Sequence, residues 1–247
     1  MKRFILFFLL VALTSTTVSA QPGVIRRRQN TTTPTKPNNP TKPTKPTKPT
    51  KPTTPARTSN CPDGNHPHLI DLGLPSGTKW ACCNVDAKNP EDYGGYYAWG
   101  ETTTKSEYNW KTYKHYDSSS KKNQSLGSSI CGTQYDVAHV KWGGSWQMPT
   151  KEQIIELKDK CKHVWTTQNG VKGRKFTGPN GRSIFLPAAG YRWDTDFSNV
   201  GSDGYCWSGT QSTESESSAY NLYFISDDAG WTYYSRDYGR SVRPVAR

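Results

Sequence analysis

A tryptophan- and glycine-rich run in the second half of the chain constrains the fold more than any other stretch. It spans Trp142 to Thr150 and reads WGGSWQMPT. We interpret this run as a strand, loosened by its glycines, that stops at Pro149 because proline donates no backbone hydrogen bond. The residues that follow then have to begin a new element.

That new element is predicted to be a helix over about 150–162. Thr150 suits the N-cap position, and Gln153 three residues later completes a capping box. Ile154, Leu157 and Cys161 recur at spacings of three and four, which gives one apolar face. This is the only helix that the sequence predicts clearly, and a weaker pattern suggests a short second helix near 90–93.

Most other patterns indicate strands and turns. Segments 175–177 and 183–186 flank a turn that contains Asn-Gly, a preferred hairpin pair. Segments 220–224 and 231–235 flank a second turn at 227–230, and a last strand over 241–243 is expected to stop at Pro244. Residues 61–247 are therefore predicted to form one α+β domain with a mostly antiparallel sheet and long loops.

The first sixty residues differ from the rest. A basic start, an apolar run over 4–13 and a small-residue site at 18–20 predict a secretory signal peptide cut after Ala20. The run is too short for a membrane span, which needs about 20 apolar residues. Residues 21–60 carry a Thr-Lys-Pro repeat, which favours an extended polyproline II tail with lysines along one edge. Such a tail is either a plain spacer or a segment that binds an acidic polymer.

Charge separates the tail from the domain. Eleven of the 32 Lys and Arg residues, and none of the 20 Asp and Glu residues, lie in residues 1–60. The domain thus carries 21 basic and 20 acidic side chains, so residues 1–60 contribute +11 of the net charge of +12. A nucleic-acid partner is not expected, since the domain lacks a basic excess. All nine Trp and all fourteen Tyr lie in the domain, which predicts an aromatic core.

Six cysteines in an exported chain favour disulfide bonds. Cys82 and Cys83 are adjacent, so on a strand they would point to opposite faces and seek different partners. We predict a disulfide between Cys83 and Cys161 that ties an early strand to the helix. The alternative is that some cysteines remain as small buried thiols.

Five separated blocks, at 71–81, 97–102, 142–150, 186–192 and 239–245, resemble the Fibrobacter succinogenes major paralogous domain family. This family is widespread in exported proteins of Bacteroidetes-type bacteria, and the match covers nearly all of residues 69–245. It is more distantly similar to the C-type-lectin-like superfold, which includes formylglycine-generating enzymes and bacterial glycosaminoglycan-binding adhesin domains. The resemblance implies a C-type-lectin-like fold whose N- and C-terminal strands meet and whose long loops carry binding. It also implies that Arg243 anchors the last strand, but it implies no particular activity.

An enzyme is not expected. Formylglycine-generating relatives would need two cysteines close in sequence, whereas the nearest neighbour of Cys206 is Cys161. The five histidines are scattered and form no hydrolase or metalloprotease motif. The adjacent carboxylates at 91–92 and 227–228 fit solvated turns better than a glycosidase pair. We therefore predict no catalytic residue and no cofactor.

Metal binding is not predicted either. His66 and His68 flank a proline near the start of the domain, where a solvated loop is the more typical interpretation. Asp194, Asp196 and Asp203 offer three hard oxygens, but calcium takes about six to eight. The Glu-Pro-Asn and Trp-Asn-Asp motifs of calcium-binding lectins are also missing.

Exposed aromatics are the remaining candidates for binding. Trp193 lies between charged residues at the start of an irregular loop, where exposure and burial are equally expected; Trp80, Trp99, Trp142, Trp146 and Trp207 lie inside the motif blocks and are predicted to be core. Aromatic faces with polar tips suit sugar rings or protein hot spots. Loops 192–203 and 226–236 are predicted to form one contact face. The candidate ligand-binding residues are Arg192, Trp193, Asp194, Asp196, Trp231, Tyr233 and Tyr234.

These patterns together predict a non-enzymatic binding module, secreted or at the cell surface. Its expected ligand is a glycan or another extracellular polymer, including an acidic one. The alternative is a structural protein or adhesin whose cationic tail docks to an envelope layer or to a protein partner.

Overall fold

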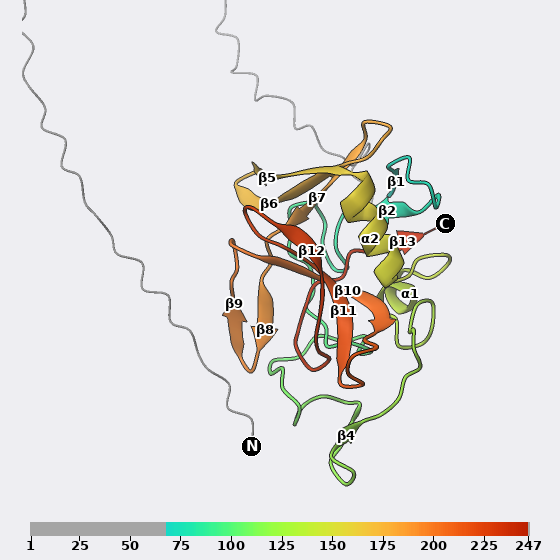
Figure 1. Cartoon of the computed structure of the whole chain (residues 1–247). Coiled ribbons are helices and arrows are strands. Elements are labelled where there is room, and N and C mark those ends of the chain that lie inside the picture. Colours follow the sequence, from blue (N-terminus) through green and yellow to red (C-terminus); the bar gives the residue numbers. More distant parts are fainter. Residues whose placement is uncertain (1–67, 247) are drawn as a thin grey trace, which may run out of the picture. The chain divides into compact units, whose positions relative to one another are not determined.

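The computed structural model describes residues 68–246 (Figure 1). The predicted signal peptide and tail, together with Cys61 and His66, lie outside the described residues.

The described residues form an α+β structure of two helices and small antiparallel sheets. The helices are α1 (Val137–Trp142) and α2 (Lys151–Lys160). The strands are β1 (Leu69–Asp71), β2 (Lys79–Ala81), β3 (Tyr116–Asp117), β4 (Lys122–Asn123), β5 (Lys162–Gln168), β6 (Val171–Thr177), β7 (Ser183–Pro187), β8 (Tyr191–Trp193), β9 (Asp196–Ser198), β10 (Gly204–Gln211), β11 (Ser218–Phe224), β12 (Ala229–Ser235) and β13 (Val245–Ala246). The sheet orders are β1-β2-β13, β5-β6-β7, β10-β11-β12, β3-β4 and β8-β9.

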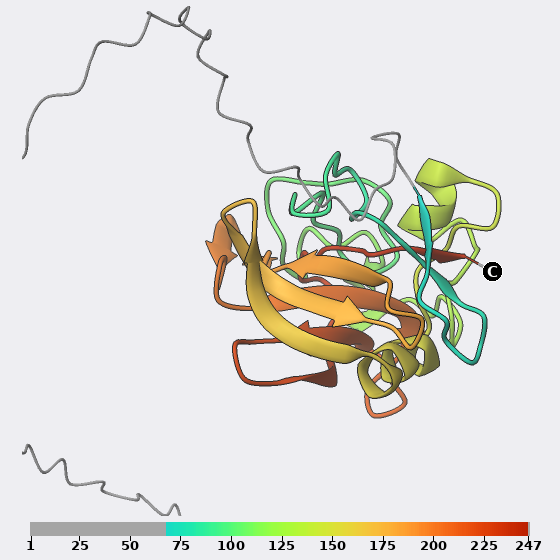
Figure 2. The same ribbon diagram turned by 90° about the horizontal axis from the view of Figure 1, so that it is seen from above.

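The predicted helix is confirmed as α2. The Thr150 hydroxyl accepts from the backbone N–H of Gln153, and the Gln153 side chain accepts from the Thr150 N–H at 2.9 Å. These reciprocal bonds satisfy two N–H groups that a helix start leaves without partners. Ile154 and Leu157 are buried, and α2 lies against the β10-β11-β12 sheet (Figures 1 and 2).

The prediction of a strand in the tryptophan- and glycine-rich run at 142–150 is wrong. Trp142 instead ends α1, whose N-cap Asp136 accepts from the N–H groups of Ala138 and His139. Gly143 follows with a φ of 67°, a left-handed conformation that glycine adopts without strain. A good cap at each end thus makes a helix of six residues, too short to show in the hydrophobic pattern.

The two predicted hairpins are confirmed. β6 pairs with β7 around the Asn-Gly turn, and β11 pairs with β12 in one continuous register. The short helix expected near 90–93 is a turn. The last strand is also misplaced in the prediction, since β13 begins after Pro244, whose carbonyl accepts from the N–H of Ala81. β13 pairs with β2, which also pairs with β1, so the first and last strands of the described residues lie in one sheet.

The core is aromatic, as predicted, although not every predicted tryptophan lies in it. Trp80, Trp99 and Trp207 are fully buried. Trp142 and Trp146 are half-buried instead and pack edge to face, with ring centroids 5.1 Å apart. They lie where α1 ends and the chain turns, so the core covers only part of each ring.

The predicted disulfide between Cys83 and Cys161 is not formed, because Cys161 carries a free thiol. The Cys83 sulfur lies 3.6 Å from the Ala87 carbonyl oxygen and 3.8 Å from the Cys82 sulfur. β2 ends at Ala81, so the alternation that would separate Cys82 from Cys83 no longer applies. Burial raises the pKa of Cys161 to about 11, which keeps it a thiol at neutral pH.

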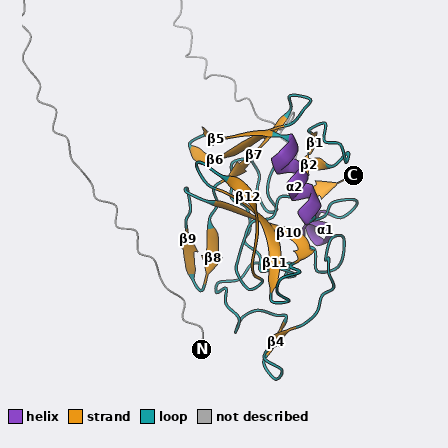
Figure 3. Ribbon diagram, in the orientation of Figure 1, coloured by secondary structure: helices purple, strands orange, loops and turns teal. Residues whose placement is uncertain are grey.

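Loops make up most of residues 82–136 (Figure 3). Few of their backbone groups belong to a sheet ladder, so other donors must satisfy the buried carbonyls. Arg243, which is fully buried, supplies several of them. Its guanidinium donates to the Asn84 side chain at 2.8 Å, the Cys82 carbonyl at 3.0 Å and the Phe185 carbonyl at 3.0 Å.

No helix in residues 68–246 is long and apolar enough to cross a membrane.

Replacing Arg243 with methionine should lower the free energy of unfolding by more than about 3 kcal/mol, because buried carbonyls lose their donors. Chemical denaturation measures this loss. Arg182→Met is the matched control, since Arg182 is exposed in a turn and its loss should stay within about 0.5 kcal/mol. Equal losses in the two variants would show that Arg243 does not anchor the fold.

Candidate ligand-binding groove

The predicted contact face divides into two surfaces, because side chains alternate along β12. Trp231 and Tyr233 contact Tyr220, with ring centroids 5.7 and 6.2 Å apart. Tyr234 points the other way and packs edge to face against Tyr238 at 4.7 Å. The prediction that these residues form one contact face is therefore wrong. Trp231 and Tyr233 lie on one surface, and Tyr234 lies on another.

Arg192 is predicted to bind ligand, but the structure uses it as an anchor. Its guanidinium donates to the carbonyls of Lys105, Ser106 and Thr195 at 2.8–3.0 Å. It also lies 4.5 Å from the centre of the Phe197 ring. These contacts fix a loop that is more than 80 residues away in sequence.

The two aspartates of the predicted site are exposed at the turn between β8 and β9. Asp194 has a left-handed φ of 48°, and its carboxylate accepts from the Asn109 side chain at 2.7 Å. Asp203, weighed with them for calcium, accepts from Asn199 and from the Tyr205 hydroxyl. Within residues 68–246, no group of three or more His, Cys, Asp or Glu side chains is arranged to hold a metal ion.

Trp193 lies in the wall of a groove of about 680 Å³. It is half-buried and stacks on Tyr238, with ring centroids 4.3 Å apart and planes 22° apart. Trp110 and Tyr116 supply two more aromatic walls and contact each other at 5.2 Å. The polar lining residues are Lys121, Lys122, Asn123, Ser215, Glu216, Ser217, Ser235 and Asp237.

Trp110, Tyr116 and Tyr238 are missing from the predicted site. Trp110 is 50% exposed and lies between Asn109 and Lys111, the same polar flanking that singled out Trp193. The polar neighbours of Trp110 could therefore have identified it as a candidate binding residue from the sequence alone. No local pattern could have placed it in one groove with Trp193, because Trp110 lies in a loop that is distant in sequence from β8, the strand that ends at Trp193.

Asp237 gives the groove a recessed acceptor. The residue is only 5% exposed, yet its side chain lines the groove. The Ser235 hydroxyl donates to one carboxylate oxygen, and no other described residue donates to this carboxylate. The other oxygen is left to accept from water or from a ligand. Glu216, in the turn between β11 and the preceding strand, adds a second and exposed carboxylate.

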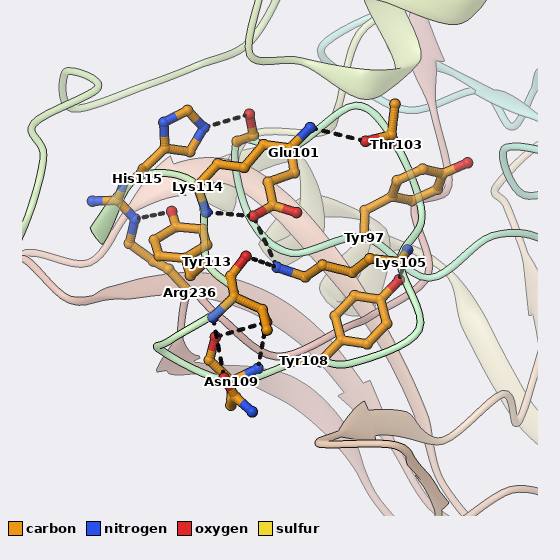
Figure 4. Close-up of polar contacts among 12 residues, drawn as sticks. Tyr97, Glu101, Thr103, Lys105, Tyr108, Asn109, Tyr113, Lys114, His115 and Arg236 are labelled. Atoms are coloured by element: carbon orange, nitrogen blue, oxygen red, sulfur yellow. Dashed lines mark hydrogen bonds and ion pairs between the residues drawn. The ribbon is translucent and has the colours of Figure 1, made fainter. Parts of the chain in front are cut away.

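One buried arginine, Arg236, holds two walls of the groove; its contact with Tyr113 is drawn in Figure 4. Arg236 is 1% exposed and donates to the carbonyls of Gln124 and Glu216, both at 3.2 Å. Gln124 follows the β4 wall residues, and Glu216 belongs to the facing turn. The guanidinium also donates to the Tyr113 hydroxyl at 2.9 Å and lies 4.6 Å from the Trp99 ring centre.

A second buried network fixes the loop that carries Trp110 (Figure 4). Glu101 is buried and accepts from the Lys105 ammonium at 2.9 Å and from the Lys114 N–H at 2.8 Å. Lys105 also donates to the Thr112 carbonyl at 2.9 Å. The loop that crosses from Glu101 to Lys114 is thereby tied to one carboxylate.

His115 belongs to the same network, where its Nε2 lies 3.0 Å from the Gly100 carbonyl oxygen. Burial lowers the pKa of His115 below its ordinary value. The unfolded chain therefore takes up a proton at about pH 6.5, before the folded chain does. The protonation of His115 therefore lowers the free energy of unfolding as the pH falls through about 6.5.

Wild-type protein should consequently lose more stability than His115→Gln between about pH 7.5 and pH 5.5, by up to about 1 kcal/mol. The glutamine amide keeps a donor for the Gly100 carbonyl but does not titrate. Unfolding free energies of both proteins, measured across this range, provide the test. Parallel pH profiles would contradict the assignment of a lowered pKa to His115.

Comparison of the chain with protein-family models, curated proteins and solved structures found no match. The resemblance to the Fibrobacter succinogenes major paralogous domain family thus stays a prediction from the sequence motifs. The function has to be inferred from the groove itself.

Proposed function

We propose that this protein is an exported, non-enzymatic module that binds a glycan in the groove. The observation that carries the proposal is the lining: four aromatic side chains surround a recessed carboxylate. These aromatics are Trp110, Tyr116, Trp193 and Tyr238, and the carboxylate is Asp237. The candidate site keeps Trp193 from the sequence prediction and replaces most of the other predicted residues.

The chemistry of the lining suits a sugar. A sugar ring has an apolar face of C–H groups, which packs on flat aromatic rings, and an edge of hydroxyl groups, which needs polar partners. Asp237 and Asn123 supply such partners beside the rings. The groove volume of about 680 Å³ lies within the range of about 300–1,000 Å³ that is usual for small-ligand sites.

The charge of the lining favours a neutral sugar. Lys121 and Lys122 bring two positive charges, and Glu216 and Asp237 bring two negative charges. Their formal charges cancel, so neither a strongly acidic nor a strongly basic polymer gains a general electrostatic advantage. We therefore favour a neutral glycan as the ligand of the groove.

The walls of the groove are held in place before any ligand arrives. Arg236 ties the Gln124 and Glu216 segments together, and Glu101 ties down the loop of Trp110. A preformed site loses less conformational entropy on binding, so more of the contact energy appears as affinity. This supports binding as the role of the groove.

Fold and export belong to the same proposal. The pairing of β2 with β13 and the long loops of residues 82–136 agree with a C-type-lectin-like fold. The predicted signal peptide supports export. Membership of the Fibrobacter succinogenes major paralogous domain family would account for both features.

Trp193→Ala and Trp110→Ala should each weaken binding of a neutral glycan about tenfold or more, because each variant removes a stacking surface. A screen against neutral polysaccharides identifies the ligand, and calorimetry measures the affinities. Tyr233→Ala is the control, since Tyr233 is an exposed aromatic that does not line the groove. Unchanged affinity in both tryptophan variants would refute the proposal.

The tail provides the test of the alternative function. A protein that lacks residues 21–60 should bind the neutral glycan as well as the full chain does. If binding disappears with the tail and falls steeply with salt, docking by the cationic repeat is the correct function.

A further inference from the structure

A second aromatic surface lies on the opposite side of β12 from Tyr234. Trp231 and Tyr233 are each 43% exposed there, and Tyr220, on the neighbouring strand β11, contacts both rings edge to face. β12 is an edge strand, because it pairs only with β11 in its sheet. We refer to Lys151, Tyr220, Trp231 and Tyr233 as the edge-strand surface. None of its members lines the groove.

Lys151 places a positive charge on the edge-strand surface. Its ammonium group lies 3.9 Å from the ring centre of Tyr220 and 3.9 Å from that of Trp231. The side chain is half-buried, and no carboxylate of residues 68–246 forms an ion pair with it. The rings hold the ammonium in place and leave its charge without an opposite partner.

The position of this lysine is unfavourable for the helix. Lys151 is the first residue of α2, where the helix dipole disfavours a cation. Cation–π contacts with the rings of Tyr220 and Trp231 offset this cost. A residue that breaks a local rule and is then held by specific contacts is typical of a functional position.

The surface continues as a furrow between α2 and β12. Ile155 and Lys158 follow Lys151 on the same face of the helix, at spacings of four and seven. Ile155 and Lys158 line a cavity of about 350 Å³ with Trp231 and Gly230, and the carboxylates of Asp159 and Asp228 also lie in its lining. Lys158 pairs with Asp159 at 3.0 Å, whereas Lys151, on the same face of α2 but outside the cavity lining, has no carboxylate partner among the described residues.

We propose that the edge-strand surface is a second glycan site, specific for a negatively charged sugar residue. The ammonium of Lys151 binds the carboxylate or sulfate group, and the sugar ring packs on the exposed faces of Trp231 and Tyr233. A charged group next to a stackable ring is the feature that uronate and sulfated sugars share. The groove has balanced charges and takes a different ligand, so this site does not depend on the proposed function of the groove.

Binding of a tetragalacturonate to the full chain, at about 0.15 M salt, tests the site by calorimetry. Lys151→Gln and Trp231→Ala should each weaken this binding about tenfold, whereas Lys151→Arg should retain it. Lys160→Gln is the matched control, because it removes the same charge from an exposed position on the same helix. The methyl ester of the tetragalacturonate keeps the rings but not the charge, and it should bind about tenfold more weakly.

The outcomes separate this site from the tail and from the groove. The basic residues of the tail are the same in every variant, so equal affinities of wild type and Lys151→Gln would assign binding to the tail and overturn the proposal. Equal affinity for the acid and its methyl ester would overturn it as well. A sulfated tetrasaccharide, measured in parallel, shows whether carboxylate or sulfate binds more tightly. If no neutral glycan binds the groove, the proposed function fails while this comparison still decides the second site.

Discussion

Three buried arginines near the end of the chain organise the domain. Arg236, Arg240 and Arg243 are each at most 2% exposed, and their hydrogen bonds reach segments up to about 160 residues away in sequence. Burying a guanidinium is costly unless its donors are satisfied and its charge is stabilised. Backbone carbonyls and asparagine side chains accept hydrogen bonds from the three guanidiniums, and aromatic rings face the charges of Arg236 and Arg240. Among the described residues, Nη2 of Arg236 and Nε of Arg240 are buried without a hydrogen-bond partner.

The contacts of Arg240 offset the free-energy cost of burying its charge. It donates to the Asn221 side chain at 2.7 Å and lies 4.4–4.9 Å from the ring centres of Tyr205, Trp207 and Tyr234. Burial lowers its pKa to about 10, which still leaves it charged at neutral pH. Each arginine therefore connects segments that are distant in sequence through its side-chain contacts. This arrangement explains how a chain with small sheets keeps long loops in place.

The groove is a consequence of this arrangement. Its walls come from short strands, loops and turns that do not all belong to one sheet, and Arg236 joins two of these walls by hydrogen bonds. The same C-terminal segment also supplies the groove with Asp237 and Tyr238. A single stretch of chain thus provides both the support and part of the binding surface, which links the stability of the domain to the shape of the site.

Local patterns predicted the parts of the structure that depend on local bonds. The capping box of Thr150 and Gln153 located α2, and the Asn-Gly turn located the β6-β7 hairpin. Helix α1 was missed, because six residues show no period and Asp136 alone signals the start. Alternation along β12 was visible in the sequence and should have separated Tyr234 from Trp231 and Tyr233.

The groove itself was beyond the reach of local patterns. Trp110 and Trp193 meet only because loops are fixed by hydrogen bonds across more than 80 residues. Arg192 was read as a binding residue because it stands beside Trp193, whereas its donors go to carbonyls of the distant loop. The sequence therefore indicated an aromatic-rich binding domain but not which aromatics share a surface.

Hydrogen–deuterium exchange of Arg236→Gln tests most directly whether a buried arginine holds the groove in shape. The Gln124 N–H, which donates to the His115 carbonyl at 2.7 Å, reports on one wall, and the Ser218 N–H, which donates to the Ser215 carbonyl at 3.0 Å, reports on the other. We expect both amides to exchange faster in the variant, while the β5-β6-β7 sheet keeps its wild-type protection. Unchanged exchange at both amides would contradict this account, as would an equal loss of protection throughout the domain.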